Sequence, residues 1–318
     1  MNYFSNKKTS FGVGVFAFMA IVLAIPFLAI GDSYKELYVD KNASGTENGS
    51  KNHPFKTISQ AIEQVKDNDG TKIYVAKGKY EENINIPEDA QIIGAGSSET
   101  TIKADDDDDT VVYMEHGTKL SGVTVENGKQ GIIVKKKSRA EISNVIVQNN
   151  DKEGILVLGA DSKDERYEVT ISKSIIRNNE WSGLYVQEDR KIVLIKSSFS
   201  KNDGNGMALS KSVELWAEDS SFEENEKSGV LAVLDNSDIS LIDCDINENN
   251  REGLELNAYG SKGYANIDNV NFEENNRYGF ARISRNSGIE KAWKNVTEKN
   301  NTYKSNEFGG LSSILKIF

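Results

Sequence analysis

The chain has few of the residues that crosslink proteins or bind soft metal ions: its 318 residues include one Cys, two His and four Met. A single Cys excludes a disulfide within the chain, so the fold does not depend on an oxidising compartment. The scarcity of His and Met argues against direct handling of transition metals. We therefore predict no resident metal or other cofactor from these residue types.

Positive charge is also scarce, because 38 Lys and Arg stand against 49 Asp and Glu and the formal net charge is -11. Proteins that bind nucleic acid need a basic surface, so we predict no nucleic-acid partner. The same balance disfavours an acidic polysaccharide held by charge alone, unless a cation bridges the two.

The chain does contain a repeat. Between residues 120 and 283, an Asn, three further residues, a Gly and a short apolar stretch recur together. Successive copies lie about 23 to 29 residues apart, a period typical of solenoid proteins. The repeated Asn residues are Asn127, Asn150, Asn179, Asn202, Asn225, Asn249 and Asn275.

Apolar and polar residues alternate around each copy, which predicts three short strands per repeat. Three strands and about 23 residues per coil describe an all-β fold, a right-handed parallel β-helix. Coils of such a solenoid stack ~4.8 Å apart, so like residues stack on like. We expect the Asn row to form a ladder whose amides satisfy backbone groups of the turns, a structural role and not a catalytic one.

Residues 1–31 differ from the rest of the chain. Phe11–Ile30 contains no charged residue and is long enough to span a bilayer, and Lys7 and Lys8 before it place the N-terminus in the cytoplasm. Two interpretations stay open: a retained signal-anchor, or a signal peptide cut near Ala29. Both predict that the remaining chain is extracytoplasmic, either as a single-pass protein of the cell membrane or as a secreted one.

Residues 32–119 are predicted to form an N-terminal cap and the first, irregular coils, and residues 120–318 the regular repeats with a C-terminal cap. The ends of a solenoid expose strand edges and core, so both need covering. An amphipathic helix with Thr57 as its N-cap is suited to cover the first coil. Its apolar stripe is Ile58, Ala61, Ile62 and Val65.

Several local features between residues 38 and 102 are characteristic: the Pro54–Ile58 entry to the helix, the Ile73–Val75 strand, and the turn from Gly94 to Gly96. With them, this stretch resembles the N-terminal segment of pectin-lyase-like right-handed β-helix proteins. The Asn-Asn-x-x-x-Gly coils that follow resemble the repeats of that superfamily, and are similar to those of copper-enzyme-maturation β-helix proteins. The resemblance implies the fold and little about chemistry, because this scaffold hosts many functions.

In the polysaccharide-active relatives, the substrate groove runs along the outside of the strand that follows the repeated Gly. Here that face carries an apolar band that is larger than a solvated surface needs, which predicts that something covers it. The alternatives are a sugar, a protein partner, or one of the chain's own insertions, at Gly159–Tyr167, Ala258–Tyr264 and Arg285–Asn301. The predicted binding positions are Leu156, Leu158, Tyr185, Gln187, Leu231, Val233, Glu255 and Asn257.

The catalytic motifs of pectin methylesterases, calcium pectate lyases and polygalacturonases are absent from this face. The remaining candidates for a lyase are Lys135, Tyr185, Glu188 and Arg190, which form no recognisable constellation.

A second set of candidates is a pair of acids. Asp219 and Asp243 are expected to stack on neighbouring coils ~5 Å apart, where two carboxylates can act as acid and base. Lys196 beside Asp219 makes a surface ion pair the alternative interpretation.

Five consecutive acids, Asp105–Asp109, favour either a calcium site or a solvated, self-repelling turn. Adjacent residues of a strand point to opposite faces, so all five cannot converge on one ion. Calcium is therefore a possible ligand and not a required one.

Three hypotheses for function follow. The first is a membrane-anchored, extracytoplasmic module that binds carbohydrate or builds a surface. The second is a polysaccharide lyase or glycoside hydrolase that acts on cell-surface or environmental glycans. The third is an extracytoplasmic maturation factor. The predicted partners are a glycan and, through residues 11–30, the membrane; no oligomeric state is predicted.

Overall fold

The computed structural model describes residues 35–66, 70–160, 167–286 and 293–316. The predicted membrane segment, residues 11–30, lies outside these ranges. Within them, no helix is both long and apolar enough to cross a membrane.

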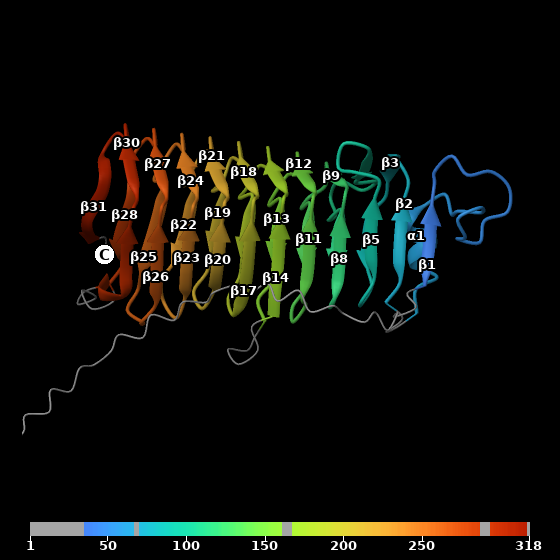
Figure 1. The fold of residues 1–318 in the computed structure, drawn as a ribbon, viewed down its shortest axis with the longest axis horizontal. Coiled ribbons are helices and arrows are strands. Elements are labelled where there is room, and N and C mark those ends of the chain that lie inside the picture. The colour runs from blue at the N-terminus through green and yellow to red at the C-terminus, as the bar shows by residue number, and fades with distance from the viewer. Residues whose placement is uncertain (1–34, 67–69, 161–166, 287–292, 317–318) are drawn as a thin grey trace, which may run out of the picture. The chain divides into compact units, whose positions relative to one another are not determined.

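The described residues form three parallel sheets that run along one solenoid (Figure 1). Each strand pairs in parallel with the equivalent strands of the coils before and after it. The sheets contain eleven, ten and ten strands. The predicted boundary between residues 119 and 120 falls inside a strand of the first sheet, so strand pairing continues across it.

The first sheet contains β1 (Glu36–Val39), β2 (Lys72–Val75), β5 (Gln91–Gly94), β8 (Thr118–Ser121), β11 (Ala140–Ser143), β14 (Tyr167–Ser172), β17 (Arg190–Ile195), β20 (Glu214–Glu218), β23 (Asp238–Ile242), β26 (Tyr264–Asp268) and β29 (Val296–Lys299). The second contains β3 (Gly78–Glu81), β6 (Thr100–Lys103), β9 (Thr124–Glu126), β12 (Ile146–Gln148), β15 (Ile175–Arg177), β18 (Ser198–Ser200), β21 (Ser221–Glu223), β24 (Asp245–Asn247), β27 (Asn271–Glu273) and β30 (Thr302–Lys304). The third contains β4 (Ile84–Ile86), β7 (Val112–Met114), β10 (Ile132–Val134), β13 (Ile155–Val157), β16 (Leu184–Val186), β19 (Met207–Leu209), β22 (Val230–Val233), β25 (Leu254–Ala258), β28 (Tyr278–Ser284) and β31 (Gly309–Lys316).

Rows of like side chains fill the space between the sheets. Burial alternates along the strands, as in β20, where Leu215 and Ala217 are buried and Trp216 is exposed. Phe199 and Phe222 stack on neighbouring coils with ring centroids 5.3 Å apart. The period-two alternation of the sequence therefore corresponds to an inward row and an outward row on each strand.

An Asn ladder occupies the turn between the second and third sheets. The Nδ2 group of Asn150 donates to Oδ1 of Asn179 at 2.8 Å, and Asn202 donates in the same way to Asn225 at 3.0 Å. The backbone N–H of Asn202 also donates to Oδ1 of Asn225. The same bonds continue through Asn249 and Asn275 to Asn306. Each amide thus satisfies buried backbone and side-chain groups of its neighbours.

Asn127 is not part of this ladder, contrary to the expectation from the repeat. Glu126 pairs with Gln148, so Gly128, and not Asn127, is aligned with Asn150. The N–H of Gly128 donates to Oδ1 of Asn150 and ends the ladder there. Asn127 has the left-handed φ of 61°, and this turn is one residue shorter than those after it. Counting back from Gly131 therefore gave the wrong register.

A second ladder of smaller side chains lines the bend between the first and second sheets. The hydroxyl oxygens of Ser197 and Ser220 accept the backbone N–H groups of Ser174 and Ser197, each at 3.2 Å. The residue before each of these positions has a left-handed backbone, as at Asp219 with a φ of 51° and Asp243 with a φ of 52°. The bend thus places the two acids outside the coil.

A short helix, α1 (Ile58–Ile62), contacts β1, β2 and β4. Thr57 is its N-cap and forms a capping box with Gln60, as the sequence predicts. Ile58 and Ala61 are buried in the core. The helix is shorter than its apolar stripe indicated, because Gln64 and Val65 form tighter bonds to the carbonyls three residues before them.

Candidate functional site

The outward face of the third sheet carries the predicted apolar band. Strand register aligns Leu156 with Tyr185 on the next coil, and Leu231 lies two coils beyond Tyr185. All three are half-buried, so part of each side chain is open to solvent. The hydroxyl groups of Tyr185 and Ser210 lie 3.4 Å apart. This row therefore offers an apolar surface with a polar edge.

The second outward row of this face is closer to the following turn. Register places Leu158 beside Gln187, and Val233 beside Asn257. Leu158, Gln187 and Val233 are half-buried, whereas Asn257 is 3% exposed. Oε1 of Gln187 accepts the N–H of Gly159 at 3.1 Å. The row thus becomes more covered towards the C-terminal coils.

A pocket of about 590 Å³ opens where four successive strands of this sheet, β16, β19, β22 and β25, run into their turns. One carboxylate organises it: Asp235 accepts the N–H groups of Tyr259 at 2.7 Å and Ser261 at 2.6 Å. These bonds hold the turn so that the Tyr259 side chain stays 53% exposed. The lining residues are Glu188, Ser210, Lys211, Val233, Asp235, Asn236, Tyr259 and Ser261.

Two buried acids lie at the C-terminal end of the same face. Glu252 is 4% exposed and Glu255 is 1% exposed. Oγ of Ser228 lies 3.4 Å from Oε2 of Glu252 and 3.2 Å from Oε2 of Glu255. Nδ2 of Asn257 donates to Oε1 of Glu255 at 3.1 Å. The two carboxylates are therefore held against each other through one hydroxyl.

Three arginines cover these acids. Arg251 contacts Glu255 at 3.4 Å and Glu252 at 3.5 Å. Arg277 contacts Glu252 at 3.3 Å, and Arg285 contacts Glu255 at 3.4 Å. We name Glu252, Glu255, Arg251, Arg277 and Arg285 the carboxylate–arginine cluster. The pairing explains how two charges remain buried on an outward face.

Sequence reasoning found only one member of this cluster. Glu255 was identified because it occupies an outward strand position. Glu252 was missed because it lies in the turn, directly before the repeated Gly253. The available signal was a spacing: Glu252 and Glu255 lie three residues apart, and the three preceding coils hold Ser182, Asn205 and Ser228 at the position of Glu252.

Arg190, a candidate lyase residue, is fully buried. Its Nη1 group donates to the carbonyls of Leu158 at 3.1 Å and Lys135 at 3.3 Å, and Nη2 donates to that of Ser138. Burial lowers the pKa of Arg190 to about 10, which still leaves it cationic at neutral pH. The guanidinium joins the turns of preceding coils, and a substrate on the outward face does not reach it.

The other lyase candidates lie apart from one another. Nζ of Lys135 forms an ion pair with Glu115 and lies 5.4 Å from the ring of Tyr113. Glu188 forms an ion pair of 3.5 Å with Lys211 at the pocket. Tyr185 contacts Ser210 on the next coil. Each of these three side chains therefore has a different partner, and none of the three pairs with another within the described residues.

Asp219 and Asp243 occupy equivalent positions of neighbouring coils, on the bend between the first and second sheets. Asp219 contacts Lys196 at 3.8 Å, on the preceding coil, and Asp243 accepts from Nδ2 of Asn269, on the following coil. Asp219 thus pairs with the coil before it, and Asp243 with the coil after it. They lie on a different corner of the solenoid from the third sheet.

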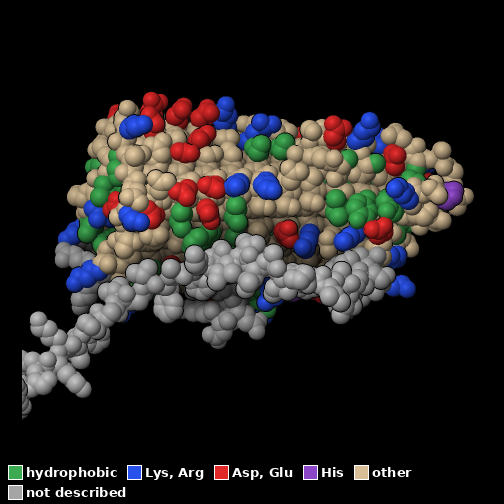
Figure 2. Space-filling view, in the orientation of Figure 1, with side chains coloured by type: hydrophobic (Ala, Val, Ile, Leu, Met, Phe, Trp, Pro, Cys, Tyr) green, Lys and Arg blue, Asp and Glu red, His purple; other side chains and the backbone are tan. Residues whose placement is uncertain are grey.

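Acidic side chains also gather over the second sheet, at its C-terminal end (Figure 2, upper left). Burial raises the pKa of Glu223, and Asp245, Glu248 and Glu224 nearby raise it further. This patch differs from the carboxylate–arginine cluster, because four acids lie near one another and one of them, Glu224, pairs with Lys201 at 3.4 Å.

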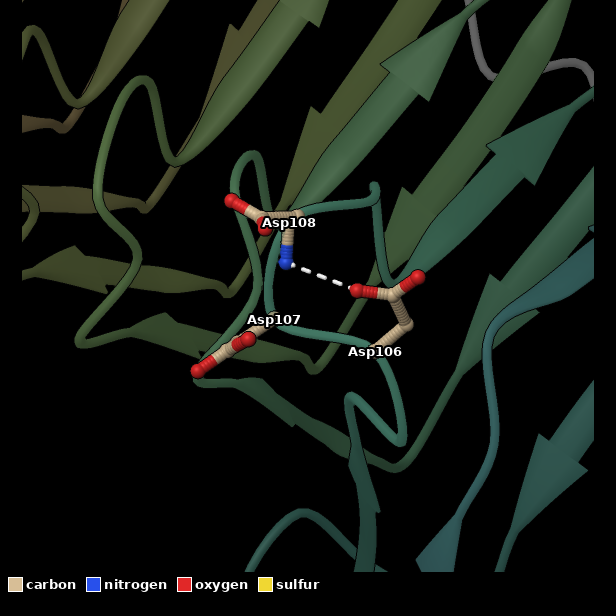
Figure 3. A group of neighbouring side chains, drawn as sticks. All are labelled: Asp106, Asp107 and Asp108. Atoms are coloured by element: carbon tan, nitrogen blue, oxygen red, sulfur yellow. Dashed lines mark hydrogen bonds between the residues drawn. The ribbon is translucent and has the colours of Figure 1, made fainter.

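The Asp105–Asp109 run brings three acids into one group. The ligand oxygens of Asp106, Asp107 and Asp108 can lie within 4.8 Å of one another, and all three residues are exposed. Asp106 turns towards the backbone N–H of Asp108, which donates to it at 3.0 Å, while Asp107 and Asp108 point outward (Figure 3). Asp109 accepts from Thr110 and Tyr113 instead. These bonds are those of a solvated turn.

Comparison with known proteins places this solenoid in a class. A family model described as "Right handed beta helix region" matches residues 161–315. The fold, with its three parallel sheets, is that of the pectin-lyase-like right-handed β-helix proteins, as the sequence resemblance indicated. A second model, described as "Periplasmic copper-binding protein (NosD)", matches residues 63–231, which is more than half of the chain. The chain belongs to the NosD family.

Solved structures of similar fold include several proteins of carbohydrate chemistry. Pectate lyase Pel9A is 15% identical over 91% of this chain and 80% of its own, with a TM-score of 0.56. The A-module of Azotobacter vinelandii mannuronan C-5 epimerase AlgE4 is 15% identical over 88% and 99%, with a TM-score of 0.54. XylC, solved with xylose, is 9% identical over 84% and 70%, with a TM-score of 0.66. A comparison with curated protein sequences found no match.

Proposed function

We propose that the chain is an extracytoplasmic β-helix module that binds a glycan along the outward face of the third sheet. The observation that carries this proposal is the 590 Å³ pocket with an exposed Tyr259, at the end of a half-exposed apolar row. Sugar rings have an apolar face and a rim of hydroxyl groups. A surface that combines an aromatic ring with several polar side chains is suited to both.

The arrangement also supports binding across several coils. Glu188, Ser210, Val233 and Tyr259 follow four successive strands, and neighbouring strands lie ~4.8 Å apart. A linear polymer that lies along the solenoid axis therefore meets a new set of side chains at each coil. The named activities of the structural relatives, on pectate and mannuronan, agree with this orientation at the level of fold only.

Two structural parts of the proposal concern the ends of the chain. The charge pattern of Lys7, Lys8 and Phe11–Ile30 supports a single membrane anchor or a cleaved signal, with the β-helix outside the cytoplasm. The periplasmic description of the family agrees with that side of the membrane. The burial of Ile58 and Ala61 supports a role for α1 in covering the first coil.

Catalysis is the second candidate function, as a lyase or a glycoside hydrolase. The placement of Lys135, Arg190 and Asp219 supports it poorly. Arg190 is buried and donates to backbone carbonyls, that of Lys135 among them, while the Lys135 side chain pairs with Glu115 and Asp219 lies on the bend beside Lys196. Lys135, Tyr185 and Glu188 are the candidates that remain on the proposed binding face, each with a separate partner. Binding without turnover is therefore the function that the geometry favours.

Copper handling, which the family's description names, does not fit the sulfur-containing side chains of the described residues. Met114 and Met207 are fully buried in the core, and Cys244 is buried and donates to the carbonyl of Ile242 at 3.2 Å. Burial raises the pKa of the Cys244 thiol to about 11, whereas a metal ligand must be a thiolate. We derive no step that uses copper.

The full-length chain in mild detergent, titrated with neutral and uronate polysaccharides, tests the proposal. Binding is measured by calorimetry, and unsaturated or shortened products are measured in the same samples. We expect binding of at least one glycan without product. Formation of unsaturated or shortened products would show that the chain is a lyase or a glycoside hydrolase. The absence of binding to every polysaccharide tested would contradict the proposal.

A further inference from the structure

The carboxylate–arginine cluster has an inner, acidic layer and an outer, basic layer. The side chains of Glu252 and Glu255 are 5% and 2% exposed. Those of Arg251, Arg277 and Arg285 are 36%, 44% and 29% exposed. Three guanidinium groups stand over two carboxylates, so the solvent side of the cluster presents positive charge on a chain whose net charge is -11.

In the turn before the third sheet, one position beside the cluster is neutral where most other coils have an acid. The residue that follows the ladder Asn is acidic on most coils, namely Asp151, Glu180, Asp203, Glu226 and Glu307. Before Arg251 and Arg277, the same position holds the neutral Asn250 and Asn276. The coils of Arg251 and Arg277 therefore lack the acid that most other coils carry at this position, whereas the coil of Phe308 keeps it as Glu307.

Arg277 is the member with the most capacity for a ligand. Its Nη1 group contacts Oε1 of Glu252 at 3.3 Å, and its guanidinium has no other hydrogen-bond or ion-pair partner within the described residues. Phe308 lies on the next coil, where its backbone N–H donates to the carbonyl of Arg277. The Phe308 ring is 57% exposed and packs edge-on against Tyr278, with centroids 5.8 Å apart. A half-exposed guanidinium and an exposed aromatic ring thus lie in equivalent turns of neighbouring coils.

We propose that Arg277, supported by Arg251 and Arg285, binds the acidic group of a glycan, with Phe308 against the sugar ring. The ligand class is a glycan that carries carboxylate, sulfate or phosphate groups. The buried acids position the guanidinium groups, which leaves their outer N–H groups to donate to an anion. This inference rests on the proposed glycan-binding function and adds the chemical class of the ligand.

Matched pairs of polymers that differ only in charge test the inference. We choose galacturonan and its methyl ester, carboxymethyl cellulose and hydroxyethyl cellulose, and dextran sulfate and dextran, each titrated into the full-length chain in detergent. In at least one pair, the anionic polymer is expected to bind about tenfold more tightly than its neutral partner. The carboxylate and sulfate pairs distinguish the two sources of anion.

Substitution of one arginine separates a binding role from a structural one. Arg277→Gln is expected to weaken the anionic polymer about tenfold and to leave the neutral polymer unchanged, and Arg277→Lys to recover part of the loss. Arg177→Gln is the control, since Arg177 is exposed on the second sheet and bonds to Gln148. Phe308→Ala, which removes no charge, is expected to weaken the same polymer several-fold, and thermal melting checks each fold.

Equal affinity within every pair, with binding retained, would overturn the anion site and leave the proposed function intact. So would an Arg277→Gln variant that binds the anionic polymer as the unmodified chain does. If none of the six polymers binds, the proposed function and this inference fail together.

Discussion

The inside and the outside of the same coils follow different rules in this molecule. In the turn before the third sheet, Asn150 to Asn306 repeat one hydrogen-bond pattern on seven coils. On the outward face of the third sheet, equivalent positions hold Leu156, Tyr185, Ala208, Leu231 and Glu255 in turn. The repeated positions build the solenoid, and the positions that do not repeat are those in which a ligand can be recognised.

The largest expected effect comes from breaking the repeated pattern. Asn202→Ala removes the acceptor of the backbone N–H and the Nδ2 group of Asn179 and leaves the carbonyl of Ile176 without its donor. Unpartnered buried polar groups cost about 1–3 kcal/mol each, so we expect a loss of about 4 kcal/mol in the free energy of unfolding. Urea denaturation measures it.

The control for that change is Asn276→Ala, because Asn276 is exposed and its side chain donates to the exposed Asn250. Its effect is expected within about 0.5 kcal/mol. Equal effects of the two substitutions would contradict a structural role for the buried ladder.

The next effect concerns the buried acids of the outward face. Glu255→Gln keeps the shape of the side chain and removes the charge that faces Arg251 and Arg285. Breaking a buried ion pair costs about 3–5 kcal/mol, and partial exposure of both arginines brings the expected loss to about 3 kcal/mol. Glu141→Gln, at an exposed pair with Lys119, is the matched control. Urea denaturation measures both variants. If the denaturation midpoint of Glu255→Gln equals that of the unmodified chain, the cluster contributes nothing to stability.

Cys244 offers a pH-dependent test of the inner row. Burial raises its thiol pKa from an ordinary value near 9 to about 11. The unfolded chain therefore loses this proton first, and the stability that the neutral thiol contributes is complete below pH 9 and is lost as the pH rises to about 11. Cys244→Ser, which continues the row of Ser197 and Ser220, is expected to be nearly neutral at pH 7.

The difference between Cys244→Ser and the unmodified chain should change across that alkaline window, by at most about 2.7 kcal/mol. Unfolding free energies measured at pH 8 and pH 11 provide the comparison. A difference that is independent of pH would contradict a buried, protonated thiol.

The smallest effect is expected at the exposed bend. Lys196→Ala removes a 3.8 Å ion pair with Asp219, whose side chains are 60% and 46% exposed. Such pairs contribute about 0–1 kcal/mol, so both stability and glycan affinity should remain nearly unchanged. A loss of glycan binding here would place the site on the bend and not on the third sheet.

The contrast between inside and outside also decides what could be predicted from sequence. The coil, the Asn row and the capping residue Thr57 are encoded by local patterns that recur or have strict geometry, and they were predictable. The register at Asn127 was not, because a turn shortened by one residue breaks the count from Gly131. The carboxylate–arginine cluster was not predictable either, because Arg251, Arg277 and Arg285 come from three turns and meet only when coils stack.

The burial of individual polar side chains could not be predicted from the sequence pattern either. Arg190 begins a strand of the first sheet, and a strand position alone does not reveal that its guanidinium turns inward to three carbonyls. Tyr259 and Asp235 lie in turns of different length on neighbouring coils. Such contacts depend on how the coils stack and not on the period of the sequence repeat.

The most direct test of the account compares two exposed tyrosines in one calorimetric titration with the bound glycan. Tyr259 is 53% exposed at the pocket, and Tyr264 is 57% exposed on the first sheet. We predict that Tyr259→Ala weakens binding about tenfold, as loss of an aromatic contact of roughly 1.4 kcal/mol would, while Tyr264→Ala binds as the unmodified chain does. Full affinity in Tyr259→Ala would contradict a glycan site on the outward face of the third sheet.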